Sequence, residues 1–329
     1  MKYPEIPLAQ SILQICKAKG LKNIIISPGS RNAPLTIGFS IDPLFNCYSI
    51  ADERCAAFFA LGIAQQTLEP AILVCTSGSA LLNYYPAIAE AFYSQIPLIV
   101  ISADRPTSKI DIGDGQTIRQ RNVFENHSLF NANLEDEATS KNDLLIQEAI
   151  RISFSKKGPV HINAPFEEPL YNTVDETSYK PLITHYKPER KPEINFDLYN
   201  AVFQNTKKKL VLIGVQNPNV LSEEIIQKLG NDPSIVVMTE ITSNVSHPNF
   251  VSNIDTLITS FTEEDFENFQ PELLISIGGM VVSKRIKALL RKYKPNAHWH
   301  VDELRAYDTF QALTNEIETN PQTFFEAMF

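Results

Sequence analysis

The stretch PAILVCTSGSALLNYYPAIAEAFYSQIPLIVISAD, residues 70–104, predicts a strand, a turn, a helix and a second strand. The expected strands, 70–75 and 97–103, are apolar along their whole length, and the helix over 79–93 joins them. Strands without polar alternation are buried on both faces, and an intervening helix favours parallel pairing. This stretch therefore predicts an α/β domain in which helices cover both faces of a parallel sheet.

The same alternation continues on both sides of this stretch. Further strands are expected over 22–26, 45–50 and 158–162, and helices over 5–19, 34–40, 53–66 and 141–156. Ligands of such sheets collect beyond the carboxyl ends of the strands. Polar turns after the expected strands are therefore the first places to look for a site.

A second α/β pattern follows a proline-punctuated polar stretch that extends from about 168 to 195. It has expected strands over 209–213, 234–238, 273–277 and 297–301, with helices over 219–229 and 282–293. We predict two doubly wound parallel-sheet domains, 1–170 and 196–329, joined by an extended linker over 171–195.

Composition narrows the class of protein. The 329 residues are 43% hydrophobic and 20% charged, with a formal charge of −9, and no basic run is long enough to follow a phosphate backbone, so nucleic acid is not expected as a partner. The longest apolar strip, 96–103, is too short to cross a bilayer, and the N-terminal stretch is an amphipathic helix rather than a signal peptide. The four cysteines form no CxxC pair, and Cys55 and Cys75 lie in segments expected in the core. Unpaired cysteines are typical of reducing compartments, so together these features predict a soluble cytoplasmic protein without membrane insertion.

The segment DERCAAFFALGIAQQ, residues 52–66, places the carboxylate of Glu53 on the first turn of a helix that is otherwise small and apolar. A carboxylate at the edge of a buried helix loses hydration, which raises its pKa and suits it to exchange a proton with a ligand. The alternative is that Asp52 and Glu53 cap the helix and complement its dipole.

Three turns after expected strands carry candidate anion-binding groups. In SPGSRNAP, residues 27–34, backbone N–H groups lie beside Arg31, and Ser30 and Asn32 are candidate caps of the next helix. Ser77–Ser79 opens a second helix after a buried strand, and Arg105 follows a third strand. The alternatives are an ordinary turn with a surface arginine, and an ion pair of Arg105 with Asp104 or Asp52. Glu90, on the apolar helix after Ser79, favours pairing with a neighbour rather than catalysis.

Metal and nucleotide motifs are incomplete. Asp114 lies in Gly113–Gly115, which resembles the start of a metal–diphosphate signature with Asn142 downstream, but its polar surroundings favour a loop in which Gln116 reaches a ligand. His298 and His300 face the same side of an expected strand without a third ligand, so no zinc site is predicted. Gly278 and Gly279, before Lys284, half-match a nucleotide-binding turn.

Taken together, SPGSR, DERCAAFFALGIA, CTSGSALLNYYPAIAEA, PLIVISADRP, GQTIRQ, GPVHINAPFEEPLY and GGMVVSKR resemble one family in order and spacing. They are similar to the 2-succinyl-5-enolpyruvyl-6-hydroxy-3-cyclohexene-1-carboxylate synthases (MenD) of menaquinone biosynthesis. The resemblance implies a thiamine diphosphate pyrimidine-binding domain followed by a central Rossmann-like domain. It also implies a transferase that decarboxylates 2-oxoglutarate, releases CO₂ and adds the remaining carbanion to isochorismate, in a cytoplasmic homodimer or homotetramer.

The resemblance also assigns residues. Glu53 would hydrogen-bond N1′ of the aminopyrimidine, with Ser77 and Gly78 as further cofactor-binding residues. Substrate carboxylates would lie at Ser30, Arg31 and Arg105, the reacting carbon beside Gln116, and Lys284 would approach from the central domain.

Two features depart from the family. Gly115 replaces the usual Asn before Gln116, so one polar contact is expected to be missing or supplied elsewhere. The family's third domain, which binds Mg²⁺ and the diphosphate, has no counterpart up to Phe329, so no metal ligands are expected in this chain and the chain alone is expected to be inactive.

Two other functions stay open. One is a different thiamine diphosphate decarboxylase or an acetohydroxyacid-synthase-like enzyme, although its smaller, less charged substrates suit the arginine set poorly. The other is a non-catalytic module that binds a nucleotide or metabolite at the Gly278–Gly279 turn.

Overall fold

Five strands of the first sheet lie where the sequence predicts them, the sixth, over 130–133, was not predicted, and all neighbouring strands are parallel. The computed structural model describes residues 2–186 and 193–329, which divide into two compact units, Met1–Pro188 and Glu189–Phe329. In the first unit six strands have the order β3-β2-β4-β5-β7-β6. They are β2 (Asn23–Ile26), β3 (Asn46–Ser49), β4 (Ala71–Cys75), β5 (Leu98–Asp104), β6 (Phe130–Asn133) and β7 (Pro159–Pro165). Short strands β1 (Tyr3–Pro4) and β8 (Thr173–Val174) pair separately and antiparallel.

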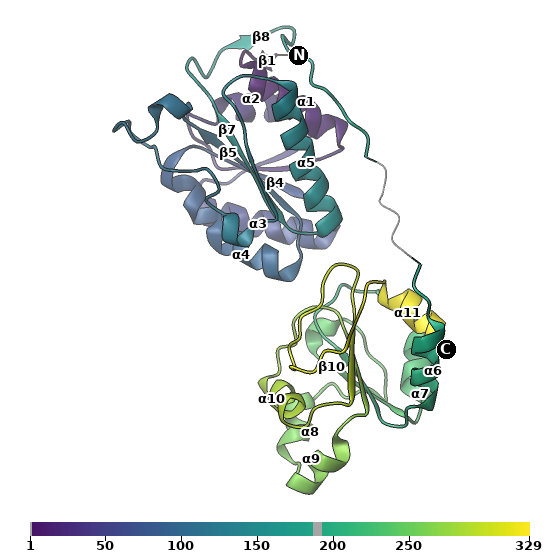
Figure 1. The fold of residues 1–329 in the computed structure, drawn as a ribbon. Coiled ribbons are helices and arrows are strands. Elements are labelled where there is room, and N and C mark those ends of the chain that lie inside the picture. The colour runs from purple at the N-terminus through teal and green to yellow at the C-terminus, as the bar shows by residue number, and fades with distance from the viewer. Residues whose placement is uncertain (1, 187–192) are drawn as a thin grey trace. The chain divides into compact units, whose positions relative to one another are not determined.

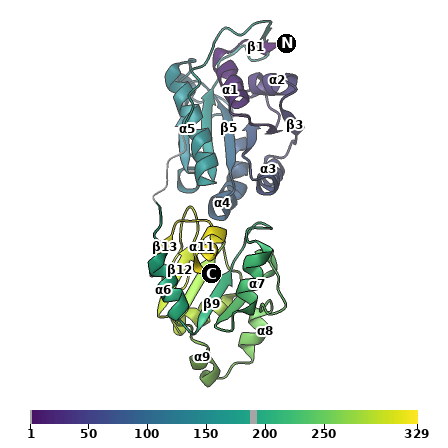
Figure 2. The same ribbon diagram turned by 90° about the vertical axis from the view of Figure 1, so that its right-hand side faces the viewer.

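Helices cover both faces of this sheet, as Figure 1 shows, and Figure 2 shows β5 between α5 and α3. One face carries α1 (Pro7–Ala18), α2 (Ala33–Ile41) and α5 (Ser140–Lys156). The other carries α3 (Glu53–Thr67), the 3₁₀ helix η1 (Gly78–Tyr84) and α4 (Tyr85–Ser94). The predicted doubly wound parallel-sheet class is confirmed.

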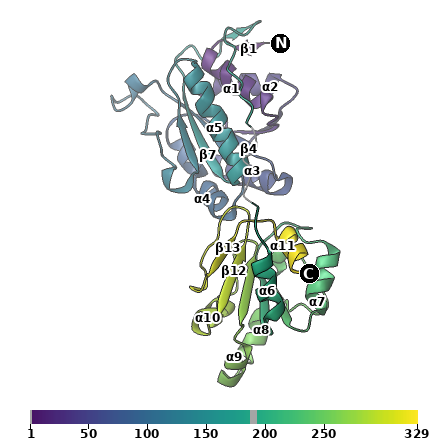
Figure 3. The ribbon, with the colours of Figure 1, turned by 45° about the vertical axis from the view of Figure 1, so that its right-hand side comes forward.

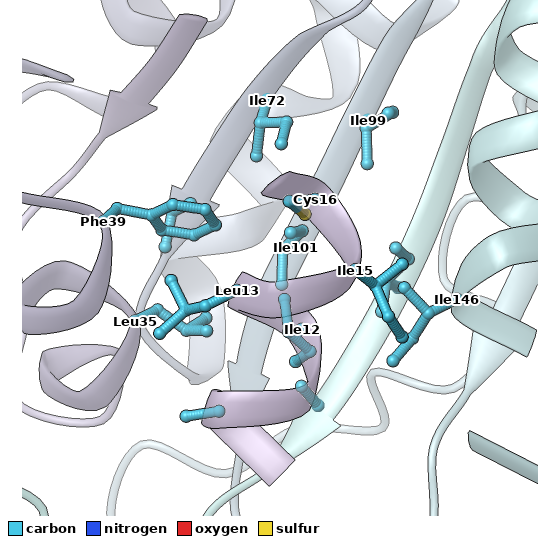
Figure 4. Packing of buried hydrophobic residues seen from close by; sticks show 14 of the residues in the cluster. Ile12, Leu13, Ile15, Cys16, Leu35, Phe39, Ile72, Ile99, Ile101 and Ile146 are labelled. Atoms are coloured by element: carbon cyan, nitrogen blue, oxygen red, sulfur yellow. The ribbon is translucent and has the colours of Figure 1, made fainter. Parts of the chain in front are cut away.

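Strand periodicity assigns each buried side chain to one face. Ile24 and Ile26 pack in the cluster under α1, α2 and α5, whereas Ile25 packs in the cluster under α3 and α4. This follows because successive side chains of a strand point to opposite faces. Figure 4 shows Ile12 and Cys16 of α1 over the strand residues Ile72, Ile99 and Ile101.

Three features of the first unit differ from the expected pattern. The strand over 45–50 is present, but unlike the wholly apolar strands every residue of β3 is exposed, because β3 is an edge strand. The helix α3 buries only its alanine-rich side, so Phe58 and Phe59 are 45% and 43% exposed. Cys55 is exposed rather than in the core, whereas Cys75 is buried as expected.

The first part of the predicted linker lies along the first unit. The Tyr179 hydroxyl and the Leu182 amide both donate to Oδ2 of Asp143 in α5, at 2.9 and 2.8 Å. The Thr184 carbonyl accepts from Lys19. Residues 187–192, which include Pro188 and Pro192 of the predicted linker, lie outside the described residues.

The second unit repeats the architecture with five parallel strands in the order β10-β9-β11-β12-β13. They are β9 (Lys209–Ile213), β10 (Ile235–Thr239), β11 (Leu273–Ile277), β12 (Ala297–Val301) and β13 (Asn315–Ile317). One face packs against α6 (Asp197–Asn205), α7 (Glu223–Asn231) and α11 (Pro321–Met328). The other packs against α8 (Ile254–Thr259), α9 (Glu263–Phe269) and α10 (Lys284–Lys292), and Figure 3 shows α10 and α6 on opposite sides of the strands.

The short elements of the second unit, α6, α8, α9, α11 and β13, were not predicted. Their sequences are brief and mixed, so the hydrophobic period is too short to distinguish helix from loop. Within the described ranges, no helix has the length and apolar character that a bilayer crossing needs.

Candidate functional site

The candidate site lies where parallel strands of the first unit end. Residues 27–32 follow β2, residues 76–79 follow β4, Arg105 follows β5, and Glu168 comes shortly after β7. Because all these strands run the same way, their carboxyl ends meet at one edge of the sheet.

The first two turns contact each other through small side chains. A Cβ atom on Gly29 would lie 2.4 Å from Cβ of Thr76, so only glycine permits this approach. The Arg31 amide donates to the Thr76 hydroxyl at 3.3 Å. Asn32 stands at the N-cap position of α2 but does not cap it, because its amide donates to the Ser27 carbonyl at 3.0 Å. Ser30 is exposed at the tip of the turn.

Two guanidinium groups converge on one carboxylate. Arg31 is 4% exposed, and it donates from Nη1 to the Phe166 carbonyl at 3.0 Å and from Nη2 to Glu168 Oε1 at 3.1 Å. Arg105 Nη1 lies 4.0 Å from the same Oε1, while Arg105 Nη2 donates to the Gly115 carbonyl at 3.0 Å. Burial and the nearby charge of Arg105 lower the pKa of Arg31.

Glu168, rather than Asp104 or Asp52, is therefore the acidic partner of both arginines. Its side chain is 65% exposed, so the carboxylate that joins the two buried or half-buried arginines is itself open to solvent. Sequence reasoning did not single out Glu168, although the segment GPVHINAPFEEPLY contains it. The pattern gave no sign that this acid folds back onto Arg31.

The turn after β4 meets the loop that carries Gln116. Gly78 has φ +87°, and a Cβ atom there would lie 3.0 Å from the Gln116 carbonyl oxygen. The Gly78 amide donates to Gln120 Oε1 at 2.8 Å. Ser77 is 2% exposed, and its buried hydroxyl has no hydrogen-bond partner in the described part of the chain. A buried hydroxyl without a partner is unfavourable, which fits a ligand group at this point.

The structure shows which of Asp52 and Glu53 caps α3 and which is available for another role. Asp52 is the N-cap of α3, and its Oδ1 accepts from the Cys55 amide at 2.8 Å. Glu53 is half-buried on the first turn and is not the cap. Burial raises the pKa of Cys75 and of Tyr84, and the Glu53 charge adds a smaller effect in the same direction on both. Glu53 therefore lies close enough to Cys75 and Tyr84 for its charge to act on them.

A buried polar network below the edge was not predicted. Asn163 of β7 donates to Asp104 Oδ2 at 2.7 Å and accepts from Ser102 at 2.9 Å, and Ser102 also lies 2.7 Å from His161 Nε2. Burial raises the pKa of Asp104 and lowers the pKa of His161 to about 3. A pocket above this network is lined by Asp104, Arg105, Gln120, Asn163 and other residues. Ser102, His161 and Asn163 are polar residues on otherwise apolar buried strands, and this interruption of the apolar pattern could have indicated the network from the sequence.

Metal ligands do not gather at the described residues. No three His, Cys, Asp or Glu side chains there form a group that could hold a metal ion. Asp114 is exposed. Asn142 is fully engaged at the start of α5, where its side chain bonds the backbone of Glu135 and Glu137.

In the second unit, the turn before Lys284 is closed by an acid. Lys284 is the exposed first residue of α10. The Val282 and Ser283 amides donate to Glu240 Oε2 and Oε1 at 2.7 and 2.6 Å. These amides would receive a phosphate in a nucleotide-binding turn, so Glu240 occupies that place.

The paired histidines of β12 share one serine. His298 Nε2 and His300 Nδ1 lie 2.7 and 2.8 Å from the Ser276 hydroxyl of β11, so both imidazoles face the same side of the sheet, as predicted. Burial lowers the pKa of His298 to about 4. The two imidazoles are thus packed side chains that share one hydroxyl group.

Comparison with known proteins identifies the class of the first unit. Residues 6–131 match the model of the thiamine pyrophosphate enzyme N-terminal TPP binding domain. The first unit is thus built on a thiamine pyrophosphate enzyme N-terminal domain.

Relatives extend the match to both units. The chain is 67% identical over 326 residues, 99% of this chain and 59% of the relative, to the 2-succinyl-5-enolpyruvyl-6-hydroxy-3-cyclohexene-1-carboxylate synthase of Flavobacterium psychrophilum. Proteins of the same name from Flavobacterium johnsoniae and Christiangramia forsetii are 64% and 49% identical over 99% and 95% of this chain. The chain belongs to this synthase family, as its motifs predicted, and it spans about 59% of the length of these curated relatives.

Proposed function

We propose that the protein carrying this sequence is a thiamine diphosphate-dependent transferase that decarboxylates 2-oxoglutarate, adds the resulting four-carbon carbanion to isochorismate and releases CO₂. The observation that carries the proposal is the convergence of Arg31 and Arg105 on one carboxylate oxygen, at the edge where Glu53 and the Ser77–Gly78 turn also lie. The chain is also similar throughout to proteins named for this product.

The cofactor-binding part of the proposal rests on three residues. Glu53, freed from capping by Asp52, would hold a proton at N1′ of the aminopyrimidine, and the unpartnered Ser77 hydroxyl would bond the same ring system. Gly78 leaves its turn open because no side chain projects from it. Thiamine diphosphate supplies the carbanion chemistry when bound.

The substrate-binding part rests on charge. Both substrates are multiply anionic, and a guanidinium grips a carboxylate through two hydrogen bonds. A substrate carboxylate would replace that of the solvent-exposed Glu168 between Arg31 and Arg105. Ser30 and Gln116, exposed on the two adjoining loops, would contact the same substrate, and Lys284 would approach it from the second unit.

The remaining parts concern assembly. We assign residues 1–170 as the pyrimidine-binding domain, 171–195 as a linker and 196–329 as the central domain. A cytoplasmic homodimer or homotetramer fits the exposed aromatic residues around α3, where the Tyr48 and Phe59 rings lie 5.4 Å apart and Phe58 is exposed. Mg²⁺ and the diphosphate would be bound by residues outside this chain.

The test is an assay of a protein of the relatives' full length that carries this sequence. With thiamine diphosphate, Mg²⁺, isochorismate and 2-oxoglutarate, we expect CO₂ release coupled to consumption of isochorismate, and we expect residues 1–329 alone to be inactive. Turnover of pyruvate in place of 2-oxoglutarate would instead support an acetohydroxyacid-synthase-like enzyme. Coupled turnover by residues 1–329 alone would contradict the assignment of the missing cofactor ligands.

A further inference from the structure

Gln120 joins three segments of the candidate site through one buried amide. Its side chain is 1% exposed. Nε2 donates to the Ala103 carbonyl at 3.1 Å and to Asn163 Oδ1 at 2.8 Å, and Oε1 accepts from the Gly78 amide at 2.8 Å. The loop over 111–120, the end of β5 and the turn after β4 therefore meet at this side chain.

Each joined segment carries a residue of the proposed site. Gly78 follows Ser77, whose buried hydroxyl has no partner in the described residues. Ala103 precedes Arg105 by two residues. Gln116 lies four residues before Gln120, and its carbonyl already abuts Gly78. A displacement of the Gln120 amide would move three sets of candidate ligands at once.

The chemistry of the site requires a primary amide of this length. The two carbonyl-type acceptors each need an N–H donor, while the Gly78 amide needs an acceptor, and only Asn or Gln offers two N–H donors together with an acceptor on one side chain. Asn is one methylene shorter. Glu would keep the acceptor for Gly78 but would have no N–H groups for Ala103 and Asn163, and it would add a charge near buried Asp104.

We propose that Gln120 is a positioning residue of this site: it holds the Gly78 turn and the Gln116 loop in register with Arg105 before any ligand binds. The inference rests on the proposed function, because the importance of Ser77, Gln116 and Arg105 comes from it. Gln120 itself contacts neither substrate nor cofactor in this account and acts through the backbone that it fixes.

The chain offers a matched control. Gln147 of α5 is 0% exposed, and its amide is also fully bonded: it donates to the Asp143 and Leu182 carbonyls and accepts from the amide and the hydroxyl of Thr184. None of these partners belongs to the proposed site. Met has nearly the length of Gln without its hydrogen bonds, so Gln120→Met and Gln147→Met remove comparable networks at different places.

The experiment compares both variants in the full-length protein with two measurements. For Gln120→Met we expect kcat to fall about 10²-fold, as misplacement of catalytic groups does, while Gln147→Met with a similar thermal midpoint keeps kcat within about threefold. We also expect hydrogen exchange at the Gly78 amide to speed up roughly tenfold or more in Gln120→Met only, because that amide loses its acceptor. Gln120→Glu, which keeps the acceptor, should retain slow exchange at Gly78.

The outcomes separate this inference from the proposed function. Equal loss of kcat in the two Met variants, or unchanged exchange at Gly78 in Gln120→Met, would overturn the positioning assignment. Absence of synthase activity in the unmodified protein would overturn the proposed function instead, and the exchange measurement would still test whether Gln120 fixes the turn.

Discussion

The two units carry the same architecture but treat the carboxyl edge of the sheet differently. In the first unit an exposed carboxylate, Glu168, lies between Arg31 and Arg105. In the second, Glu240 is tied to two backbone amides in front of α10. A ligand can displace the first carboxylate at a small cost in free energy, whereas removing the second leaves two backbone N–H groups without their charged acceptor. The carboxyl edge of an α/β sheet is therefore a potential ligand site. We call the edge open where its carboxylate is exposed and displaceable, as at Glu168, and closed where the carboxylate is bonded to backbone amides, as at Glu240.

The largest expected effect is at Glu53 of the open edge. In the full-length enzyme, Glu53→Gln should lower kcat by about 10²–10⁴, because a proton can no longer be held at that position. Stability should change little, since Asp52 caps α3. Asp52→Ala is the control: it should lower stability by about 1 kcal/mol through loss of the cap. Near-normal turnover by Glu53→Gln would remove Glu53 from the mechanism.

Acid should weaken both units through buried neutral histidines. Burial lowers the pKa of His161 in the first unit to about 3 and of His298 in the second to about 4, from 6.5. Below pH 6.5 the unfolded chain binds the proton and the folded one does not, so this stability is present above pH 6.5 and is lost as pH falls towards the folded values. Each histidine should contribute a slope of about 1.4 kcal/mol per pH unit in that window.

Urea unfolding at pH 7 and pH 5 measures this slope. Fluorescence of Trp299, the single tryptophan, follows the second unit, and amide NMR signals follow the first. His161→Gln should flatten the acid limb of the first unit only. The same acid dependence of the free energy of unfolding in the wild-type and variant proteins would show that His161 is not the group that titrates.

The two edge carboxylates form a matched pair. Glu240→Ala should destabilise the second unit by about 1–3 kcal/mol, because the Val282 and Ser283 amides lose their acceptor. Glu168→Ala should cost the first unit less than about 1 kcal/mol, since its carboxylate is exposed. The variant Glu168→Ala should also lower the KM for an anionic substrate by removing a competitor for the arginines. Equal losses of stability in the two variants would mean that Glu168 stabilises its unit as much as Glu240 does, and would contradict the distinction between the two edges.

The last comparison concerns a single added methyl group at two glycines. Gly78→Ala should cost about 1–3 kcal/mol, because φ is +87° and the Gln116 carbonyl lies 3.0 Å from the new Cβ. Gly279→Ala meets its nearest atom, the Val215 carbonyl oxygen, at 3.4 Å without a positive φ, and should change stability by less than about 0.5 kcal/mol. Thermal unfolding of the two variants measures the contrast. A larger loss for Gly279→Ala would contradict the assignment of strain to the Gly78 turn.

The difference between open and closed edges also bears on the nucleotide-binding alternative. The Gly278–Gly279 turn resembles half of a phosphate-binding motif, but the carboxylate of Glu240, the residue after β10, bonds the amides that a phosphate would use. The sequence gives no sign of this, because Glu240 lies more than thirty residues before the turn and no local pattern links them.

The sequence by itself determined the parallel α/β class, the major strands and the loops after β2, β4 and β5. Long apolar strands and the spacing of glycine and polar residues are local properties, so a linear pattern carries them. Only the tertiary structure decided that Glu168 joins Arg31 to Arg105, that Asp52 rather than Glu53 caps α3, and that Gln120 ties three loops together. These contacts join residues whose partners are set by strand order, and strand order is fixed by the packing of two layers of helices on the sheet rather than by any neighbouring residue.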